Sequence, residues 1–214
     1  MTYLNWDTKT IADLSPEFVA KMYDAGYVFT RVDKGVMNKT RSFRIDLSKF
    51  EMTSENRRIM KKAENYEMKF MSLPLSDYDW HIGKLAKDFY ESRDAYFSAN
   101  KAKELLTKPE KSSFNTLTEF SALSGKFGYV ISYNSPEIFH YSWPFYVEEK
   151  NEPSRGLSMM IKTIEWAKSA GKKYIYLGSL QRPNDTYKLQ FKGGEWFDGE
   201  KWQTDIAPLK EILK

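Results

Sequence analysis

The sequence predicts a mixed α/β fold in which helices flank a central sheet whose strands splay apart. A strand over 138–147, a helix over 156–170 and a strand over 174–177 follow one another. This order is typical of a right-handed crossover between parallel neighbours. Pro144 lies inside the first strand and cannot donate a ladder hydrogen bond, so we expect pairing to break there. Glycine-containing turns then mark a closing hairpin up to Trp202.

Composition favours one globular domain over 1–214 and excludes several kinds of chemistry. The 214 residues are 41% apolar and 16% aromatic, which suffices for a full core. The chain has no cysteine, which excludes disulfides, iron–sulfur clusters, cysteine-ligated zinc and a thiol nucleophile. No metal site is expected. Because the N-terminus lacks a secretory pattern and no apolar run approaches about 20 residues, we expect a cytoplasmic protein with no membrane partner.

Basic residues gather in the N-terminal part, about 27–70. Between residues 30 and 70 there are eleven Lys or Arg and six Asp or Glu. A helix expected over 53–66 carries like charges four residues apart, Arg57 with Lys61 and Arg58 with Lys62. Such pairs destabilise an isolated helix slightly, and a solvated face is the simple interpretation. A phosphate backbone would reverse the sign of that cost.

The other elements follow from local patterns, in chain order. Ser15 and Pro16 begin a helix that ends at Gly26, because serine caps and proline suits the first helical position. We expect a strand over 27–31, then a turn at 33–35 into a strand over 42–47. Further expected elements are a strand over 69–75 and helices over 77–95, 100–107 and 114–123, the last of them short. In the helix over 77–95 we expect Trp80, Leu85 and Phe89 to face inward and His81 to be partly exposed.

The part from about 125 to 205 carries the crossover and a predicted cleft. Strands are expected over 126–133 and 138–147, with His140 pointing away from an aromatic row into a packed or surface position. Alternation over 187–191 predicts a strand with Tyr187, Leu189 and Phe191 on one face and Lys188 on the other. If Pro144 splays its strand, a wedge opens toward the strand that begins at Tyr174.

This order of elements resembles the Gcn5-related N-acetyltransferase (GNAT) fold. Members of that family usually cradle the coenzyme A pyrophosphate in a glycine-rich loop before the crossover helix. Here the corresponding loop, 148–156, holds the acids Glu148, Glu149 and Glu152 and a single glycine. Acetyl-CoA therefore remains an alternative donor.

Two separated segments resemble the arginyl-tRNA–protein transferases, which share that fold and use an aminoacyl-tRNA donor. The first segment matches at Arg44-Ile45, Phe50, Ser54, Arg57 and Arg58, and Leu157-Ser158 lies where the family has a Leu-Gly pair. The second segment matches at Tyr176, Gly178, Tyr187, Lys188 and Phe191. The family's cysteine-rich N-terminal module is missing and the insertion between the two segments is reduced. The resemblance therefore implies a minimal enzyme without iron–sulfur regulation.

An aminoacyl ester is already activated, so its transfer to an amine needs positioning, a neutral nucleophile and oxyanion stabilisation. The resemblance implies catalytic contacts from Tyr187 and Lys188 and no cofactor besides the co-substrate. Residues expected to line the cleft around the terminal adenosine and aminoacyl group are Tyr141, Trp143, Phe145, Tyr176, Gly178 and Ser179. Residues expected to bind tRNA are Arg44, Arg57, Arg58, Lys61 and Lys62. The acids of the loop 148–156 are candidates for recognising an arginyl side chain.

Three functions stay open on the sequence. The first is an aminoacyl-tRNA-dependent transferase, with arginine as the first candidate and a protein, a peptide or a small amine as acceptor. The second is an acetyl-CoA-dependent N-acetyltransferase of the GNAT type. The third is a non-catalytic RNA-binding module, which predicts salt-sensitive affinity that does not depend on aminoacylation.

Overall fold

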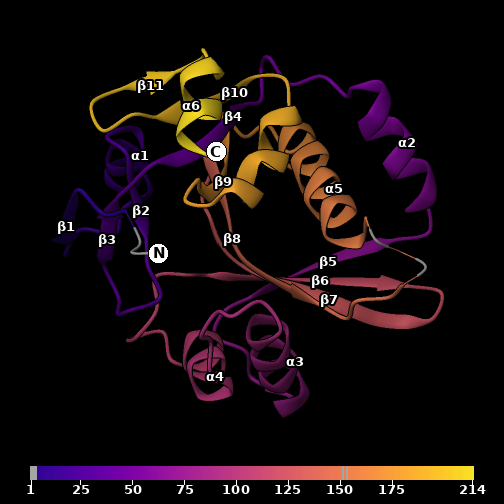
Figure 1. The fold of residues 1–214 in the computed structure, drawn as a ribbon. Coiled ribbons are helices and arrows are strands. Elements are labelled where there is room, and N and C mark those ends of the chain that lie inside the picture. The colour runs from indigo at the N-terminus through magenta and orange to yellow at the C-terminus, as the bar shows by residue number, and fades with distance from the viewer. Residues whose placement is uncertain (1–3, 151, 153) are drawn as a thin grey trace. The chain divides into compact units, whose positions relative to one another are not determined.

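The computed structural model describes residues 4–150, 152 and 154–214. They divide into two compact units that interleave along the chain. The first unit holds residues up to 54, 135–140 and 164–214, and the second holds 55–134 and 141–163. Strand β8 (Ile138–Tyr146) and helix α5 (Arg155–Ser169), both labelled in Figure 1, contribute residues to both units. The expectation of a single domain remains a prediction.

The first unit contains five strands of the large sheet in the order β11-β10-β4-β9-β8. Their bounds are β4 Ser42–Asp46, β9 Tyr174–Ser179, β10 Gly194–Phe197 and β11 Trp202–Gln203, with the start of β8. A smaller sheet has the order β1-β3-β2, with β1 Asp7–Thr10, β2 Tyr27–Phe29 and β3 Val36–Lys39. The unit also contains helices α1 (Pro16–Asp24) and α6 (Ala207–Ile212) and the 3₁₀ helix η1 (Pro183–Gln190).

Pairing between β8 and β9 is parallel, as the crossover predicts, but it is short. The paired residues run from Ile138 opposite Tyr174 to His140 opposite Tyr176. The expectation that pairing breaks at Pro144 is therefore wrong, because the last pair already lies at His140. Ile175 and Phe139, which face each other, are fully buried and belong to the apolar core of the first unit.

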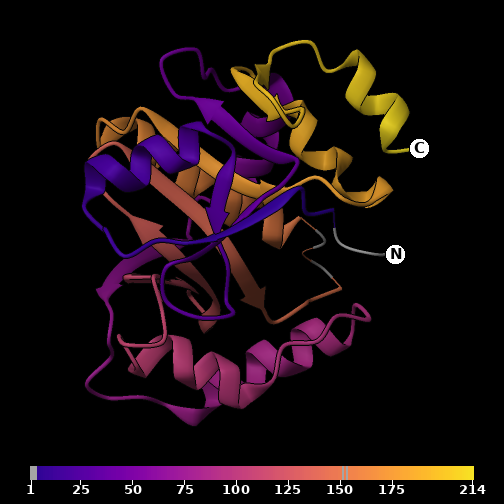
Figure 2. The same ribbon diagram turned by 90° about the vertical axis from the view of Figure 1, so that its left-hand side faces the viewer.

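The second unit contains the other strands of the large sheet, in the order β8-β7-β6-β5. Their bounds are β5 Glu67–Ser72, β6 Thr116–Ala122 and β7 Gly125–Asn134. Its helices are α2 (Ser54–Lys62, whose first residue belongs to the first unit), α3 (Trp80–Glu91) and α4 (Ala99–Thr107). Helices α3 and α4 pack side by side in Figures 1 and 2, each capped by the side chain of the residue before it, Asp79 and Ser98.

Several sequence expectations are wrong. The segment 114–123 is strand β6, not a helix, because Leu117 and Phe120 pack in the core while the backbone pairs with β5 and β7. The turn at 33–35 leads into β3, and β3 pairs with β2 before the chain reaches β4. Trp80 begins α3 with 61% of its surface exposed and does not face inward. None of the described helices is long and apolar enough to cross a membrane.

Candidate functional site

The predicted strand over 187–191 is wrong, because residues 187–190 belong to η1 and Phe191 follows its end. Pro183 lies at its start, and the Asp185 carboxylate accepts hydrogen bonds from the backbone N–H groups of Gln181 (2.7 Å) and Arg182 (2.9 Å). These bonds satisfy backbone donors that a strand would have paired with a neighbour. The turn of η1 directs Lys188 inward, and Tyr187 stays 44% exposed.

Lys188 is anchored at the end of β9. Only 6% of the residue is exposed, and its Nζ donates a hydrogen bond to the backbone carbonyl of Ser179 at 2.8 Å. A carboxylate oxygen of Asp185, Oδ1, lies 3.8 Å from the Lys188 Nζ. Predicted site residues Lys188, Gly178 and Ser179 are thereby brought together in the first unit.

A β-bulge shapes the backbone beside Lys188. Ser42 lies opposite Ser179 and Arg44 lies opposite Tyr176, so two residues of β9 face one of β4. One of the two is Gly178, whose φ of +80° is a conformation that only glycine adopts at little cost. A Cβ atom added there would lie 3.9 Å from the Lys188 Nζ, an ordinary contact, so the backbone angle and not crowding requires glycine.

Burial shifts the protonation equilibrium of Lys188 toward the neutral amine. Removal from water lowers the pKa of its ammonium group, because the charged form loses its hydration, and the charge of Asp185 opposes this effect only in part. The neutral form of the amine is therefore more accessible here than in an exposed lysine. A neutral amine that keeps a hydrogen bond to a carbonyl can accept a proton from a neighbouring group.

His140 is a buried neighbour of this amine that the sequence analysis assigned to a packed or surface position. It is 2% exposed, and burial together with the charge of Lys188 lowers its pKa to about 3. The Tyr23 hydroxyl oxygen accepts from the backbone N–H of Phe29 at 3.3 Å and lies 2.9 Å from His140 Nδ1. His81, the other histidine, lies on α3 with an exposed side chain, as expected.

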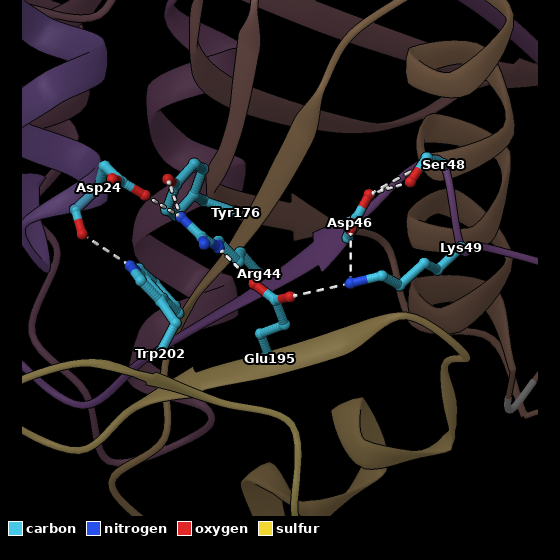
Figure 3. A network of polar contacts seen from close by, with 8 residues as sticks. All are labelled: Asp24, Arg44, Asp46, Ser48, Lys49, Tyr176, Glu195 and Trp202. Carbon is cyan, nitrogen blue, oxygen red and sulfur yellow. Dashed lines mark hydrogen bonds and ion pairs between the residues drawn. The ribbon is translucent and has the colours of Figure 1, made fainter.

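Arg44, expected to bind tRNA, lies inside a polar network of the first unit (Figure 3). The residue is 4% exposed, and its guanidinium forms ion pairs with Asp24 and Glu195, each at 2.8 Å. The Tyr176 hydroxyl lies 3.2 Å from its NH1, and the guanidinium stacks on the rings of Tyr174 and Trp202 at 3.8 and 4.0 Å. Trp202 in turn donates from Nε1 to the Asp24 carbonyl.

This network has a structural consequence for two predicted site residues. All strong interactions of the Arg44 guanidinium are made within the protein, so we leave Arg44 out of the RNA-binding set proposed below. Tyr176 is 1% exposed, and its ring packs on Tyr23 at 4.8 Å between centroids. Tyr176 therefore belongs to the core of the first unit, on the strand β9 whose last residue holds Lys188.

The remaining predicted lining residues, Tyr141, Trp143 and Phe145, lie on the part of β8 in the second unit. Tyr141 and Phe145 are 2% and 0% exposed, and Trp143 is half-buried with its ring 5.6 Å from that of Phe97. The expected cleft would join residues of both units, and it remains a prediction. No cluster of metal-binding side chains occurs among residues 4–150, 152 and 154–214.

Known structures share this arrangement of elements. The L-PGS of Bacillus licheniformis superposes with a TM-score of 0.50 at 14% identity, over 92% of this chain and 68% of that one. The C-terminal domain of a proposed lysylphosphatidylglycerol synthetase from Agrobacterium fabrum gives 0.47 at 10% identity, over 77% and 52%. A GCN5-related glucosamine N-acetyltransferase region of a fungal GH3 beta-N-acetylglucosaminidase gives 0.49 at 11% identity, over 88% and 22%.

The fold is GNAT-like. At these identities the likeness concerns the fold alone. No protein-family model and no curated protein matches the sequence.

The acidic side chains of the loop before the crossover helix form ion pairs with arginines of the same chain. Arg155 is 2% exposed and pairs with Glu152 at 2.6 Å and with Glu149 at 3.1 Å, while its NH1 donates to the Val147 carbonyl. Glu148 pairs with Arg93. The three acids considered for an arginyl ligand thus bind arginines of the chain itself. Asn151 and Pro153 of this loop lie outside the described residues.

The basic face of α2 is open to solvent. Arg57, Arg58, Lys61 and Lys62 are all exposed, whereas Asn56 and Ile59 on the opposite face are buried. Arg58 forms an ion pair with Glu55 at 2.6 Å. The helix therefore presents cations where a phosphate backbone could reach them, and the RNA contact itself remains a prediction.

Proposed function

We propose that this GNAT-like protein transfers an amino acid from an aminoacyl-tRNA to an amine. Arginine is the first candidate for the amino acid, and the acceptor is a protein N-terminus, a peptide or a small amine. The observation that carries the proposal is the Lys188 amine, buried with a lowered pKa and held on the Ser179 carbonyl. It lies in the Tyr-Lys pair through which the sequence resembles arginyl-tRNA–protein transferases.

The chemistry needs a proton acceptor of this kind. The acceptor amine arrives as an ammonium ion and must lose one proton before its nitrogen can attack the ester carbonyl. Neutral Lys188 takes that proton, the N–C bond forms, and the C–O bond to the ribose breaks. A second proton of the attacking nitrogen goes to the departing ribose oxygen, so the products are an amide, uncharged tRNA and one proton. General base catalysis of this kind contributes about 10²–10⁴-fold to a rate.

Two further observations favour tRNA over coenzyme A as the donor. The exposed cations of α2 suit a phosphate backbone, because each neutralised phosphate releases condensed counterions. Arg155, the first residue of α5, is already paired with Glu152 and Glu149 of the preceding loop, so its guanidinium is engaged within the protein. A pyrophosphate bound there would have to compete with these carboxylates for it.

A transfer assay tests the proposal directly. A pool of tRNA charged with labelled amino acids is incubated with the protein and with candidate acceptors, including peptides that begin with Asp or Glu, beside a parallel assay with labelled acetyl-CoA. We expect label to move from arginyl-tRNA. Transfer from acetyl-CoA alone would mean an N-acetyltransferase, and RNA binding without any transfer would mean a binding module.

Substitutions at Lys188 test its role. Lys188→Met removes the amine, and Lys188→Arg keeps a cation that cannot release its proton near neutral pH. We expect both variants to lose transfer about 100-fold or more while tRNA binding is kept. The wild-type rate should rise with pH as Lys188 loses its proton, and Lys188→Arg should lack that rise. Lys201→Met, at an exposed lysine, is the control. Full activity of Lys188→Arg would exclude the proton-acceptor role.

Charge reversal on α2 tests the donor. The double variant Arg57→Glu/Arg58→Glu should weaken tRNA binding and flatten the dependence of log K on log salt by about two ion equivalents. The control Lys84→Glu/Lys87→Glu reverses two exposed cations of α3 that, like Arg58, pair with acids of their own helix. Unchanged tRNA binding of the α2 variant at moderate salt would reject the basic helix as an RNA contact.

A further inference from the structure

Arg41, the residue before β4, has an environment unlike that of the other arginines considered above. Its side chain is half-buried, and its Nε is inaccessible to solvent with no hydrogen-bond partner in the described part of the chain. Burial lowers the pKa of Arg41, and no carboxylate among the described residues opposes this effect. A buried donor of a charged group that has no hydrogen-bond partner is costly, and such exceptions call for an explanation.

A second orphaned group lies next to it in the chain. Ser42 is 0% exposed, and its Oγ has no hydrogen-bond partner among the residues that the structure describes. A buried hydroxyl without a partner costs free energy on the order of 1–3 kcal/mol. Arg41 and Ser42 together therefore leave two hydrogen-bond donors unsatisfied on consecutive residues.

The backbone places these two residues at the end of β9 that holds Lys188. The Leu180 N–H donates to the Arg41 carbonyl at 2.7 Å, and Ser42 lies opposite Ser179. The Ser179 carbonyl accepts the hydrogen bond of Lys188 Nζ at 2.8 Å. Within the first unit, the Arg41 Nε without a partner thus belongs to a residue adjacent to the strand end that holds Lys188, the proposed proton acceptor.

We propose that this strand end carries an oxyanion-binding site with Arg41 as its principal ligand. Guanidinium matches phosphate and carboxylate groups through two parallel N–H donors, and such bonds are stronger than neutral ones. The bound oxyanion belongs to one of the two substrates of the proposed transfer. It is either a phosphate of the terminal nucleotide of the donor or a carboxylate of the acceptor. The choice of these two sources rests on the proposed function.

Binding of small probes tests the site without requiring transfer. The affinity of the protein for adenosine 5′-monophosphate is compared with that for adenosine, and the affinity for the dipeptide Asp-Ala with that for Asn-Ala. We expect wild type to prefer the anionic member of one pair by about 10-fold or more, as one charge-assisted hydrogen bond allows. Arg41→Gln should abolish that preference, and Arg41→Lys should restore part of it.

Arg182→Gln is the matched control, since it removes the same charge from an exposed residue close to Leu180 in the chain. An equal loss in Arg182→Gln would mean a general electrostatic field and would overturn the site. The absence of any anionic preference in wild type, or its persistence in Arg41→Gln, would overturn it too. An unfolding midpoint for Arg41→Gln at or above the wild-type value would show that the variant is folded. Lost transfer with intact Arg41-dependent binding would reject the proposed function but not the site.

Discussion

Arg44 and Lys188 are two buried cations of the same unit that the protein treats in opposite ways. They are 4% and 6% exposed. The Arg44 guanidinium has two carboxylates at 2.8 Å and stacks on two aromatic rings. Lys188 has one carbonyl at 2.8 Å and a carboxylate at 3.8 Å. One charge is compensated from several sides, and the other is compensated only in part.

The difference teaches what each residue can do. Removing a charge from water costs several kcal/mol, which close counter-charges and hydrogen bonds must offset. For Arg44 the counter-charges offset the cost of burial, and the guanidinium cannot lose its charge. Arg44 therefore serves to join β4, β10 and α1. For Lys188 the cost of burying the charge is offset to a smaller extent, and the amine can reduce that cost by losing a proton. This is the property required of a general base.

The largest effect should come from breaking the Arg44 network at Glu195. Glu195 is 8% exposed, so Glu195→Gln leaves a buried guanidinium without one of its two counter-charges. We expect the free energy of unfolding, measured by urea denaturation, to fall by about 3–5 kcal/mol. Asp24→Asn removes the other carboxylate, whose side chain is 68% exposed, and should cost under about 1 kcal/mol. Equal losses in the two variants would mean that burial does not set the strength of these pairs.

The Arg44 network shows where sequence analysis reached its limit. The strand Ser42–Asp46 follows from local alternation, and the structure confirms it. The pairing of Arg44 does not follow, because its partners Asp24 and Glu195 lie 20 and 151 residues away. The count of charges between residues 30 and 70 makes no distinction between buried and exposed arginines of this segment. Burial separates them, and burial depends on tertiary contacts.

The Lys188 region shows a different limit. Alternation over 187–191 favoured a strand, but Pro183 and the Asp185 side chain build a 3₁₀ helix, with Lys188 inside and Tyr187 outside. Local turn chemistry, a proline followed by a capping aspartate, was the signal that could have predicted this. The importance of the Tyr-Lys pair came from the resemblance to a family, and its geometry came only from the structure.

The second-largest effect should come from the titration of His140. It tests whether the surroundings of Lys188 destabilise a positive charge. Its pKa of about 3 lies below the ordinary 6.5, so between these values the unfolded chain binds more protons than the folded one. The stability that this histidine contributes is complete above pH 6.5 and is lost as the pH falls. We expect about 2 kcal/mol less stability at pH 5 than at pH 6.5 from this group.

His140→Asn should remove that part of the pH dependence, since asparagine retains an oxygen for the Tyr23 hydroxyl but does not titrate. Urea denaturation at pH 5 and pH 6.5 measures it. His81→Asn, at the exposed histidine of α3, should leave the dependence as in wild type. The same slope in wild type and His140→Asn would show that this part of the fold does not disfavour a positive charge.

The smallest effect is the stability of Lys188→Met, and it should have the opposite sign to that at Arg44. Burial holds the pKa of Lys188 below 10.5, so the unfolded chain binds the proton more tightly, and Lys188 lowers stability at neutral pH. Methionine of similar length removes this penalty, and we expect the variant to be about 1 kcal/mol more stable than wild type at pH 7. The gap should close as the pH rises above 10.5, because the wild-type amine is then neutral in both states. A variant less stable than wild type at pH 7 would mean that the lysine is as fully compensated as Arg44, and the contrast between the two cations would fail.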